Sequence, residues 1–251
     1  MIYGIIPARY ASTRLPGKPL AMIGNKPLLQ HTFESVKKSK LINEIIIATD
    51  DERILHEASS FGARVVLTPE NLETGSDRIA YVARSLADAE IIVNIQGDEP
   101  FIKGEMIDQA IAPLLFEPSI DVCTLMKKIV NIDDVRSPAV VKVTFDNHNY
   151  ALYFSRAPIP YVRDAGSESS WLDSHMIFKH VGLYVYKYDA LMQFTSLPQG
   201  ELEKTEKLEQ LRMLENGMRI KVVETDLDSF SVDTPEDLQR ANEIYRSISE
   251  K

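Results

Sequence analysis

The sequence contains a single cysteine, and it has no apolar run as long as a membrane span. Because Cys123 is the only cysteine, it cannot form an intramolecular disulfide. Because it lies among apolar residues, it is expected to be a small buried side chain. Apolar runs stay well below the ~18 residues that a membrane-spanning helix needs. No cationic segment leads into a long apolar stretch near Met1, so we expect no secretory signal and no membrane insertion. The expected location is the cytoplasm.

An excess of basic residues is also missing. The chain has 28 Lys and Arg against 37 Asp and Glu, which gives a net charge of −9. This balance argues against general nucleic-acid binding, which needs a basic face. A polyanionic ligand would therefore have to meet a local cluster of cations.

Such a cluster follows the first apolar run. Residues 2–6 predict a buried strand that ends at Pro7, and the next segment carries Arg9, Arg14 and Lys18 among small residues. The segment lacks both a P-loop ending and a Gly-x-Gly-x-x-Gly fingerprint. Small residues and cations after a buried strand favour phosphate binding, although a solvated basic loop is the simpler alternative.

Strand-like and helix-like patterns alternate in the first half of the chain. Apolar runs at 45–49, 65–67 and 91–95 predict strands, and the patterns at 26–39, 51–61, 74–87 and 104–116 predict helices. This alternation is typical of an α/β fold with a mostly parallel sheet. The whole chain, 1–251, is expected to be a single domain.

The pattern changes after Pro118. Strand-like segments with a hairpin turn at 146–149 predict an inserted β-rich lobe at about 120–190. Residues 201–216 predict one helix, residues 220–223 a late strand, and Thr234-Pro235 the start of the last helix.

Two aspartates stand out by position. Asp98 follows the strand at 91–95, and Asp233 precedes the last helix. Ligands of open α/β sheets bind at the carboxyl ends of the strands. Carboxylate oxygens with phosphates and water are typical Mg²⁺ ligands, so the pair predicts a Mg²⁺ site. A turn residue and an ordinary neighbour of a helix cap are the alternatives.

Several strings together resemble a known family. The loop at 5–20 resembles the signature of sugar nucleotidyltransferases, and in detail the chain resembles the cytidylyltransferases that make CMP-3-deoxy-manno-octulosonate (CMP-Kdo). The other strings that carry the resemblance are Gln96-Gly97-Asp98-Glu99-Pro100, Tyr150-Ala151-Leu152-Tyr153-Phe154-Ser155-Arg156, Ile159-Pro160, Lys179-His180-Val181-Gly182-Leu183-Tyr184, Leu208-Glu209-Gln210-Leu211-Arg212 and Val232-Asp233-Thr234-Pro235-Glu236-Asp237-Leu238.

The resemblance implies a Rossmann-like nucleotidyltransferase fold whose β-rich lobe dimerises. It implies transfer of CMP from CTP to the C2 hydroxyl of Kdo, for lipopolysaccharide biosynthesis, with Mg²⁺ held by Asp98 and Asp233 and with Lys18 catalytic. The implied nucleotide-binding residues are Arg9, Ser12, Arg14, Lys18, Thr74, Gly75, Arg78 and Gln96. The implied sugar-binding residues are Arg156, Arg163, His180, Tyr184, Glu209 and Gln210.

The chain departs from the family pattern near the sugar side. Gln199-Gly200-Glu201 replaces a usual Pro-Ser-Pro, and Lys179 replaces a frequent arginine. The same reaction on 8-amino-Kdo or a sialic acid therefore stays open, as does a nucleotide-binding regulator without turnover.

A homodimer is expected through the lobe. The lobe has apolar residues in excess of what its few helices could cover, and twofold dimers are the commonest oligomers. The residues that carry this expectation are Val122, Leu125, Met126, Ile129, Val141, Val143, Leu152, Phe154, Val181, Leu183 and Val185.

Overall fold

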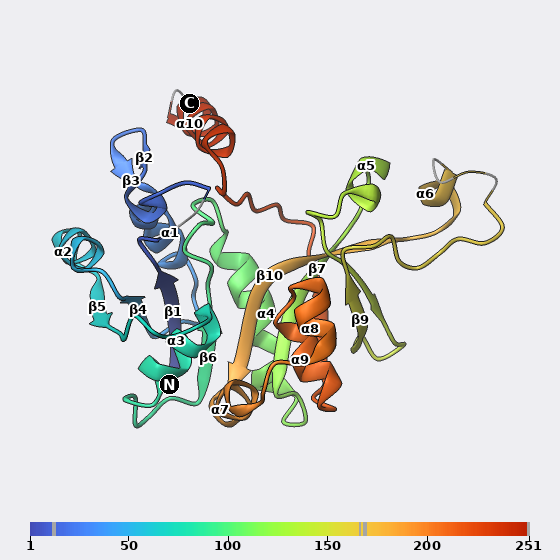
Figure 1. Cartoon of the computed structure of the whole chain (residues 1–251), viewed down its shortest axis with the longest axis horizontal. Helices are drawn as coiled ribbons and strands as arrows, with labels where there is room; N and C mark the ends of the chain where they lie inside the picture. The colour runs from blue at the N-terminus through green and yellow to red at the C-terminus, as the bar shows by residue number, and fades with distance from the viewer. Residues whose placement is uncertain (12–13, 166, 168–169, 250–251) are drawn as a thin grey trace. The chain divides into compact units, whose positions relative to one another are not determined.

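The computed structural model describes residues 1–11, 14–165, 167 and 170–249 (Figure 1). Its chain divides into two compact units. Unit 1 comprises residues 1–108 and 228–251, and unit 2 comprises residues 109–227. The expectation of one domain with an inserted lobe stays a prediction.

Unit 1 contains a parallel sheet in the order β6-β1-β4-β5. These strands are β6 (Ile91–Asn94), β1 (Ile2–Ala8), β4 (Glu44–Thr49) and β5 (Arg64–Leu67). The two central strands are almost wholly buried, as expected for strands that are covered on both faces. The predicted mostly parallel α/β fold is confirmed.

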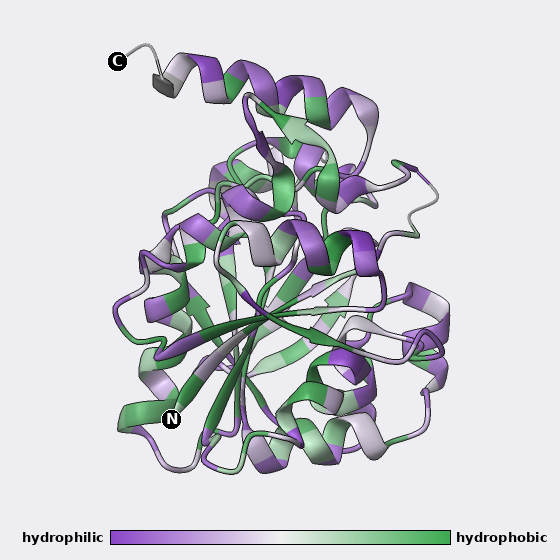
Figure 2. Cartoon of the chain, turned by 90° about the vertical axis from the view of Figure 1, so that its left-hand side faces the viewer, coloured by the Kyte–Doolittle hydropathy of each residue, from purple (hydrophilic) through white to green (hydrophobic). Residues whose placement is uncertain are grey.

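Unit 1 also contains helices. They are α1 (Leu28–Val36), α2 (Glu52–Ser60), α3 (Gly75–Ala83), α4 (Gly104–Phe116), which ends in unit 2, and α10 (Pro235–Ser249). A short 3-10 turn, η1 (Lys18–Leu20), and a hairpin of β2 (Met22–Ile23) and β3 (Lys26–Pro27) precede α1. Figure 2 shows mainly hydrophobic strands inside and a largely hydrophilic last helix.

Three sequence-based elements in unit 1 had wrong boundaries. The helix expected at 26–39 is α1, which begins at Leu28 and ends at Val36, because Lys26 and Pro27 form strand β3. The first strand continues through Pro7 to Ala8, because Pro7 still pairs in register with Ala48 while the β6 pairing ends at Ile5. A missing N–H is tolerated where one neighbouring strand has ended. The helix expected to reach residue 87 ends at Ala83.

Unit 2 is richer in antiparallel pairing. β7 (Val122–Lys128) pairs in parallel with β11 (Ile220–Glu224) and antiparallel with β10 (Phe178–Lys187), and β8 (Lys142–Phe145) forms the predicted hairpin with β9 (Ala151–Ser155). Its helices are α5 (Ile132–Arg136), α6 (Trp171–Ser174), α7 (Tyr188–Ser196), α8 (Glu201–Glu206) and α9 (Gln210–Glu215).

The single helix expected at 201–216 is in fact two helices. Lys207 adopts a left-handed conformation, with φ of 53°, between α8 and α9. The Arg156 side chain donates from Nε to the Glu206 carbonyl at 2.7 Å and from Nη2 to the Lys207 carbonyl at 3.4 Å. The residue that follows β9 therefore satisfies carbonyl groups at the break.

The apolar residues expected to leave a surface excess are mostly covered by the chain itself. The buried ones are Val122, Leu125, Met126, Ile129, Val143, Phe154, Leu183 and Val185. Leu152 of β9 is exposed. Within the described part of the chain, no helix combines the length and apolar character needed to cross a membrane.

Candidate functional site

The cation-rich loop closes on itself before η1. The Gly17 N–H donates to the Tyr10 carbonyl at 3.2 Å, and the Lys18 N–H donates to the Leu15 carbonyl at 3.1 Å. Gly17 has a φ of 66°, a conformation that glycine adopts without a Cβ penalty. This turn fixes the direction in which Lys18 leaves the loop. Ser12 lies outside the described residues.

The loop after β6 is held from two sides. A Cβ on Gly97 would lie 2.8 Å from the Pro7 carbonyl oxygen, so only glycine fits against β1. From α1, Thr32 Oγ1 donates to the Gly97 carbonyl at 3.2 Å and Ser35 Oγ donates to the Pro100 carbonyl at 2.9 Å. Asp98 therefore stands on a fixed turn.

The segment before α10 is fixed in a similar way. Asp237 Oδ2 accepts hydrogen bonds from the Asp233 N–H at 3.1 Å and from the Thr234 N–H at 3.0 Å. The Val232 N–H donates to the Asp98 carbonyl at 2.9 Å, and the Val232 side chain is buried. These bonds bring Asp233 beside Asp98.

The two aspartates meet at one ammonium group. Lys18 Nζ lies 2.6 Å from Asp98 Oδ2 and 3.0 Å from Asp233 Oδ1, and Arg14 Nη2 lies 3.0 Å from the same Asp233 oxygen. Burial alone would lower the pKa of Lys18, but the charges and hydrogen bonds of both aspartates outweigh it and raise that pKa. We call Asp98 and Asp233 around Lys18 the two-aspartate site.

A third carboxyl group, that of Glu99, lies next to Asp98 in the sequence. The Glu99 side chain is only 8% exposed, and its Oε2 accepts a hydrogen bond from Ser229 Oγ at 3.0 Å. Burial, with the charge of Asp98, raises the pKa of Glu99 to about 7.

The donor set of the two-aspartate site fits a divalent cation. Its carboxylate oxygens converge on one positive charge, as hard-cation ligands must. Among the described residues no group of three or more His, Cys, Asp or Glu side chains could hold a metal ion. A Mg²⁺ ion here would therefore depend on two protein carboxylates together with phosphate and water oxygens, which is its usual preference.

The predicted nucleotide residues fall into separate groups. Arg9 donates from Nη2 to the carbonyls of Leu72 and Thr74, ahead of α3. Thr74 caps α3, accepting from the Asp77 N–H at 3.1 Å, and Gly75 is the first helical residue. Cations beside a helix amino terminus are suited to a phosphate. Gln96 donates weakly to Asn94, at 3.5 Å.

Arg78 lies in the interior rather than on an open surface. Its side chain is fully buried, donates to Thr68 Oγ1 and forms an ion pair with Asp50, while its Nε has no hydrogen-bond partner. A direct contact of Arg78 with a nucleotide stays a prediction.

In unit 2, Arg156 is engaged in backbone contacts. Besides its bonds to Glu206 and Lys207, it donates from Nη1 to the Pro138 carbonyl at 2.9 Å. Arg163 is 86% exposed and pairs with its neighbour Asp164 at 3.0 Å. The two arginines predicted to face the sugar thus have different surroundings.

His180 and Tyr184 lie together on β10. Their ring centroids are 5.2 Å apart, and His180 Nε2 lies 2.9 Å from Thr124 Oγ1. Burial lowers the pKa of His180 to about 3, so the imidazole is neutral near pH 7. Burial also raises the pKa of Tyr184, whose hydroxyl has no hydrogen-bond partner.

Glu209 and Gln210 begin α9. The Gln210 side chain is buried, and its Nε2 also has no hydrogen-bond partner. Arg212 on the same helix forms a buried ion pair with Glu203, both 5% exposed. Tyr184 and Gln210 of unit 2 thus each have a buried polar atom without a hydrogen-bond partner, which is uncommon in folded proteins.

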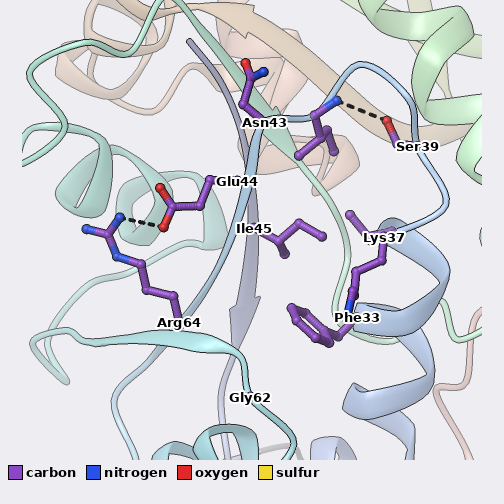
Figure 3. Close-up of a pocket in the computed structure, with 10 residues that line it drawn as sticks. Phe33, Lys37, Ser39, Asn43, Glu44, Ile45, Gly62 and Arg64 are labelled. Carbon is purple, nitrogen blue, oxygen red and sulfur yellow. Dashed lines mark hydrogen bonds and ion pairs between the residues drawn. The ribbon is translucent and has the colours of Figure 1, made fainter.

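A pocket of about 410 Å³ lies elsewhere in unit 1 (Figure 3). It lies at the amino ends of β4 and β5, and its lining includes the Arg64–Glu44 ion pair at 2.8 Å. The two-aspartate site follows the carboxyl end of β6, so this pocket is not part of it.

Comparison with known proteins identifies the family. A family model described as cytidylyltransferase matches residues 3–220. The 3-deoxy-manno-octulosonate cytidylyltransferase of Pelobacter propionicus is 51% identical over 254 residues, covering 100% of this chain and 99% of the relative. The chain belongs to the 3-deoxy-manno-octulosonate cytidylyltransferase family.

Two further relatives agree with this assignment. The cytidylyltransferase of the same name from Geobacter sulfurreducens is 51% identical and covers 96% of this chain and 98% of its own. A solved CMP:2-keto-3-deoxy-manno-octonic acid synthetase complexed with CTP is 36% identical, with a TM-score of 0.91 and coverage of 98% of both chains. The resemblance noted in the sequence is thereby confirmed.

Sequence reasoning missed several partners that hold the candidate site residues and Glu99. Asp50 and Thr68 bind Arg78, Thr124 binds His180, and Ser229 binds Glu99. Each partner comes from another segment, so no local spacing could have indicated it. Asp237 could have been found, because a Thr-x-x-Asp pattern at a helix start is typical of a capping box.

Proposed function

We propose that the protein transfers CMP from CTP to the C2 hydroxyl of 3-deoxy-D-manno-octulosonate, giving CMP-Kdo and pyrophosphate for lipopolysaccharide biosynthesis. The observation that carries the proposal is the 51% identity, over the whole chain, to relatives that are named for this reaction. The proposed compartment is the cytoplasm, where CTP is available.

In the proposed reaction the C2 oxygen of the sugar acid forms a bond to the α-phosphorus of CTP. The bond between that phosphorus and the pyrophosphate oxygen breaks, and the hydroxyl proton is released. Arg9, Arg14 and Lys18 would bind the triphosphate through charge-assisted hydrogen bonds. Orientation of the two substrates is then the main contribution of the chain's side chains.

The proposed cofactor is Mg²⁺, held by Asp98 and Asp233. When bound, it would neutralise charge on the phosphates and lower the pKa of the attacking hydroxyl. Lys18, which forms ion pairs with both carboxylates, would be released towards the phosphates. This role for Lys18 is supported by the position of its ammonium group between the two acids.

Sugar binding is proposed for unit 2, through Arg156, Arg163, His180, Tyr184, Glu209 and Gln210. A neutral His180 can donate or accept a hydrogen bond but cannot supply positive charge to the sugar carboxylate. That charge would have to come from an arginine.

Turnover tests the proposed function directly. Incubation with CTP, Kdo and Mg²⁺ should release pyrophosphate and yield a product with the mass of CMP-Kdo. Parallel reactions with 8-amino-Kdo and N-acetylneuraminate identify the preferred acid. Binding of CTP without pyrophosphate release from any of the three would favour the regulator instead.

We also propose a homodimer formed through unit 2. Val130, Tyr161 and Met176 are 85%, 75% and 64% exposed, and neighbouring residues form the small apolar core that contains Ile129 and Trp171. Exposed apolar groups of this size favour an interface. Light scattering should give twice the single-chain mass of 28.4 kDa, and Val130→Asp should lower it; a wild-type mass of one chain would contradict the dimer.

A further inference from the structure

Asp98 and Asp233 are carried by segments that are distant in the sequence. The distance between their carboxylates therefore depends on how residues 228–233 are held against residues 96–102. The backbone bond from Val232 to Asp98 is one link, and the side-chain bond from Ser229 to Glu99 is another. Only the second can be removed by changing a side chain alone.

Glu99 is an unusual residue for its surroundings. It is buried, and a carboxyl group buried with one hydrogen bond costs more free energy than an apolar side chain of similar size. The surroundings are apolar: Phe101, close to Glu99 in the sequence, and Phe230, next to Ser229, both pack against the cluster that contains Val232. The carboxyl group is therefore not explained by packing.

We propose that Glu99, through the hydrogen bond from Ser229, is a positioning residue that holds the segment of Asp233 against the loop of Asp98 and so sets the affinity of the two-aspartate site for a divalent cation. This inference rests on the proposed function, since it concerns the same site. Mg²⁺ requires near-ideal octahedral geometry, so a small shift of one carboxylate lowers affinity. Residues behind the ligands of metal sites have effects of this kind.

The test measures Mn²⁺ bound to the intact protein by electron paramagnetic resonance, with CTP present and no sugar acid. Ser229→Ala and Glu99→Met each remove the hydrogen bond and should weaken Mn²⁺ binding about three- to tenfold. The double variant should be no weaker than the worse single variant, because both remove the same contact. Glu99→Gln keeps an acceptor for Ser229 and should stay within about twofold of wild type.

The controls separate this inference from the metal site itself. Ser247→Ala removes a hydrogen bond to the Ile244 carbonyl in α10, away from the site, and should bind Mn²⁺ as wild type. Asp98→Asn and Asp233→Asn should lower binding strongly. If they do while Ser229→Ala does not, or if Glu99→Gln falls as far as Glu99→Met, the positioning role is wrong. If neither aspartate variant lowers binding, the metal site is wrong and the positioning role fails with it.

Discussion

The two units present their candidate site residues in different ways. In unit 1, charged groups meet directly, since Lys18 pairs with both Asp98 and Asp233, and Arg14 pairs with Asp233. In unit 2, Arg156 binds backbone carbonyls, whereas Tyr184 and Gln210 each keep a buried polar atom without a partner. Opposite charges stabilise one another within the protein, whereas an unpartnered neutral group gains a hydrogen bond only when a polar ligand binds.

The largest expected effect tests the charged site of unit 1. Asp98→Asn or Asp233→Asn should lower kcat by at least about a hundredfold, because an amide cannot replace an anionic oxygen as a Mg²⁺ ligand. Thermal unfolding should show that the fold is kept. Asp121→Asn, at a 61% exposed side chain that pairs with Lys187, is the matched control. If either aspartate variant keeps a near-wild-type kcat at saturating Mg²⁺, the proposal that these two aspartates hold the metal is wrong.

Replacement of Arg156 tests whether unit 2 makes a charged contact with the sugar acid. Arg156→Ala should raise KM for the sugar acid by about ten- to a hundredfold and leave KM for CTP nearly unchanged. It should also lower Tm, because the carbonyls of Pro138, Glu206 and Lys207 lose their donor. An equal rise in both KM values would mean that Arg156 only supports the fold.

Lys18→Met tests whether the Lys18 ammonium group and a metal ion compete for Asp98 and Asp233 in unit 1. Removing the ammonium group leaves Asp98 without its cation and Asp233 with Arg14 alone, so Mn²⁺ should bind about tenfold more tightly in the absence of nucleotide. Turnover should nevertheless fall, since the triphosphate loses a partner. Unchanged or weaker Mn²⁺ binding would show that Lys18 and the metal do not compete.

Tyr184→Phe examines the unpartnered hydroxyl of unit 2. The free energy of unfolding should stay equal or rise by up to about 1 kcal/mol, because a buried hydroxyl without a partner is costly. KM for the sugar acid should rise several-fold. Tyr81→Phe, at a 40% exposed side chain, is the control for removal of a hydroxyl. A loss of stability with no change in KM would indicate that the hydroxyl serves the fold.

The effect that is smallest at neutral pH concerns His180. Its pKa in the folded protein is about 3, below its usual value near 6.5, so the unfolded chain binds a proton first as pH falls. Stability should therefore decline between about pH 6.5 and 3 more steeply in wild type than in His180→Gln. Urea unfolding at several pH values measures this, and parallel curves would show that the imidazole titrates normally.

The fold was predictable where local patterns decide it. Buried strands such as β4 and the hairpin turn between β8 and β9 follow from apolar runs and turn residues. The break at Lys207 was not predictable, because no glycine or proline marks it and the compensating hydrogen bonds come from Arg156, just after β9.

The site was predictable in part for a similar reason. Asp98 and Asp233 occupy positions that sheet topology makes informative, and the structure brings them together. In the sequence, Glu99 is simply a second acidic residue beside Asp98. Only the structure shows that its carboxyl group is buried. The interior position of Arg78 depends in the same way on Asp50 and Thr68.

The discontinuity of unit 1 has a consequence for synthesis on the ribosome. Residues 1–108 can form their parallel sheet early, but Asp233 and α10 emerge only after the whole of unit 2 has been translated. A nascent chain, or one truncated before residue 233, would contain Lys18 and Asp98 but lack Asp233. Such a chain is expected to lack any turnover that depends on the two-aspartate site.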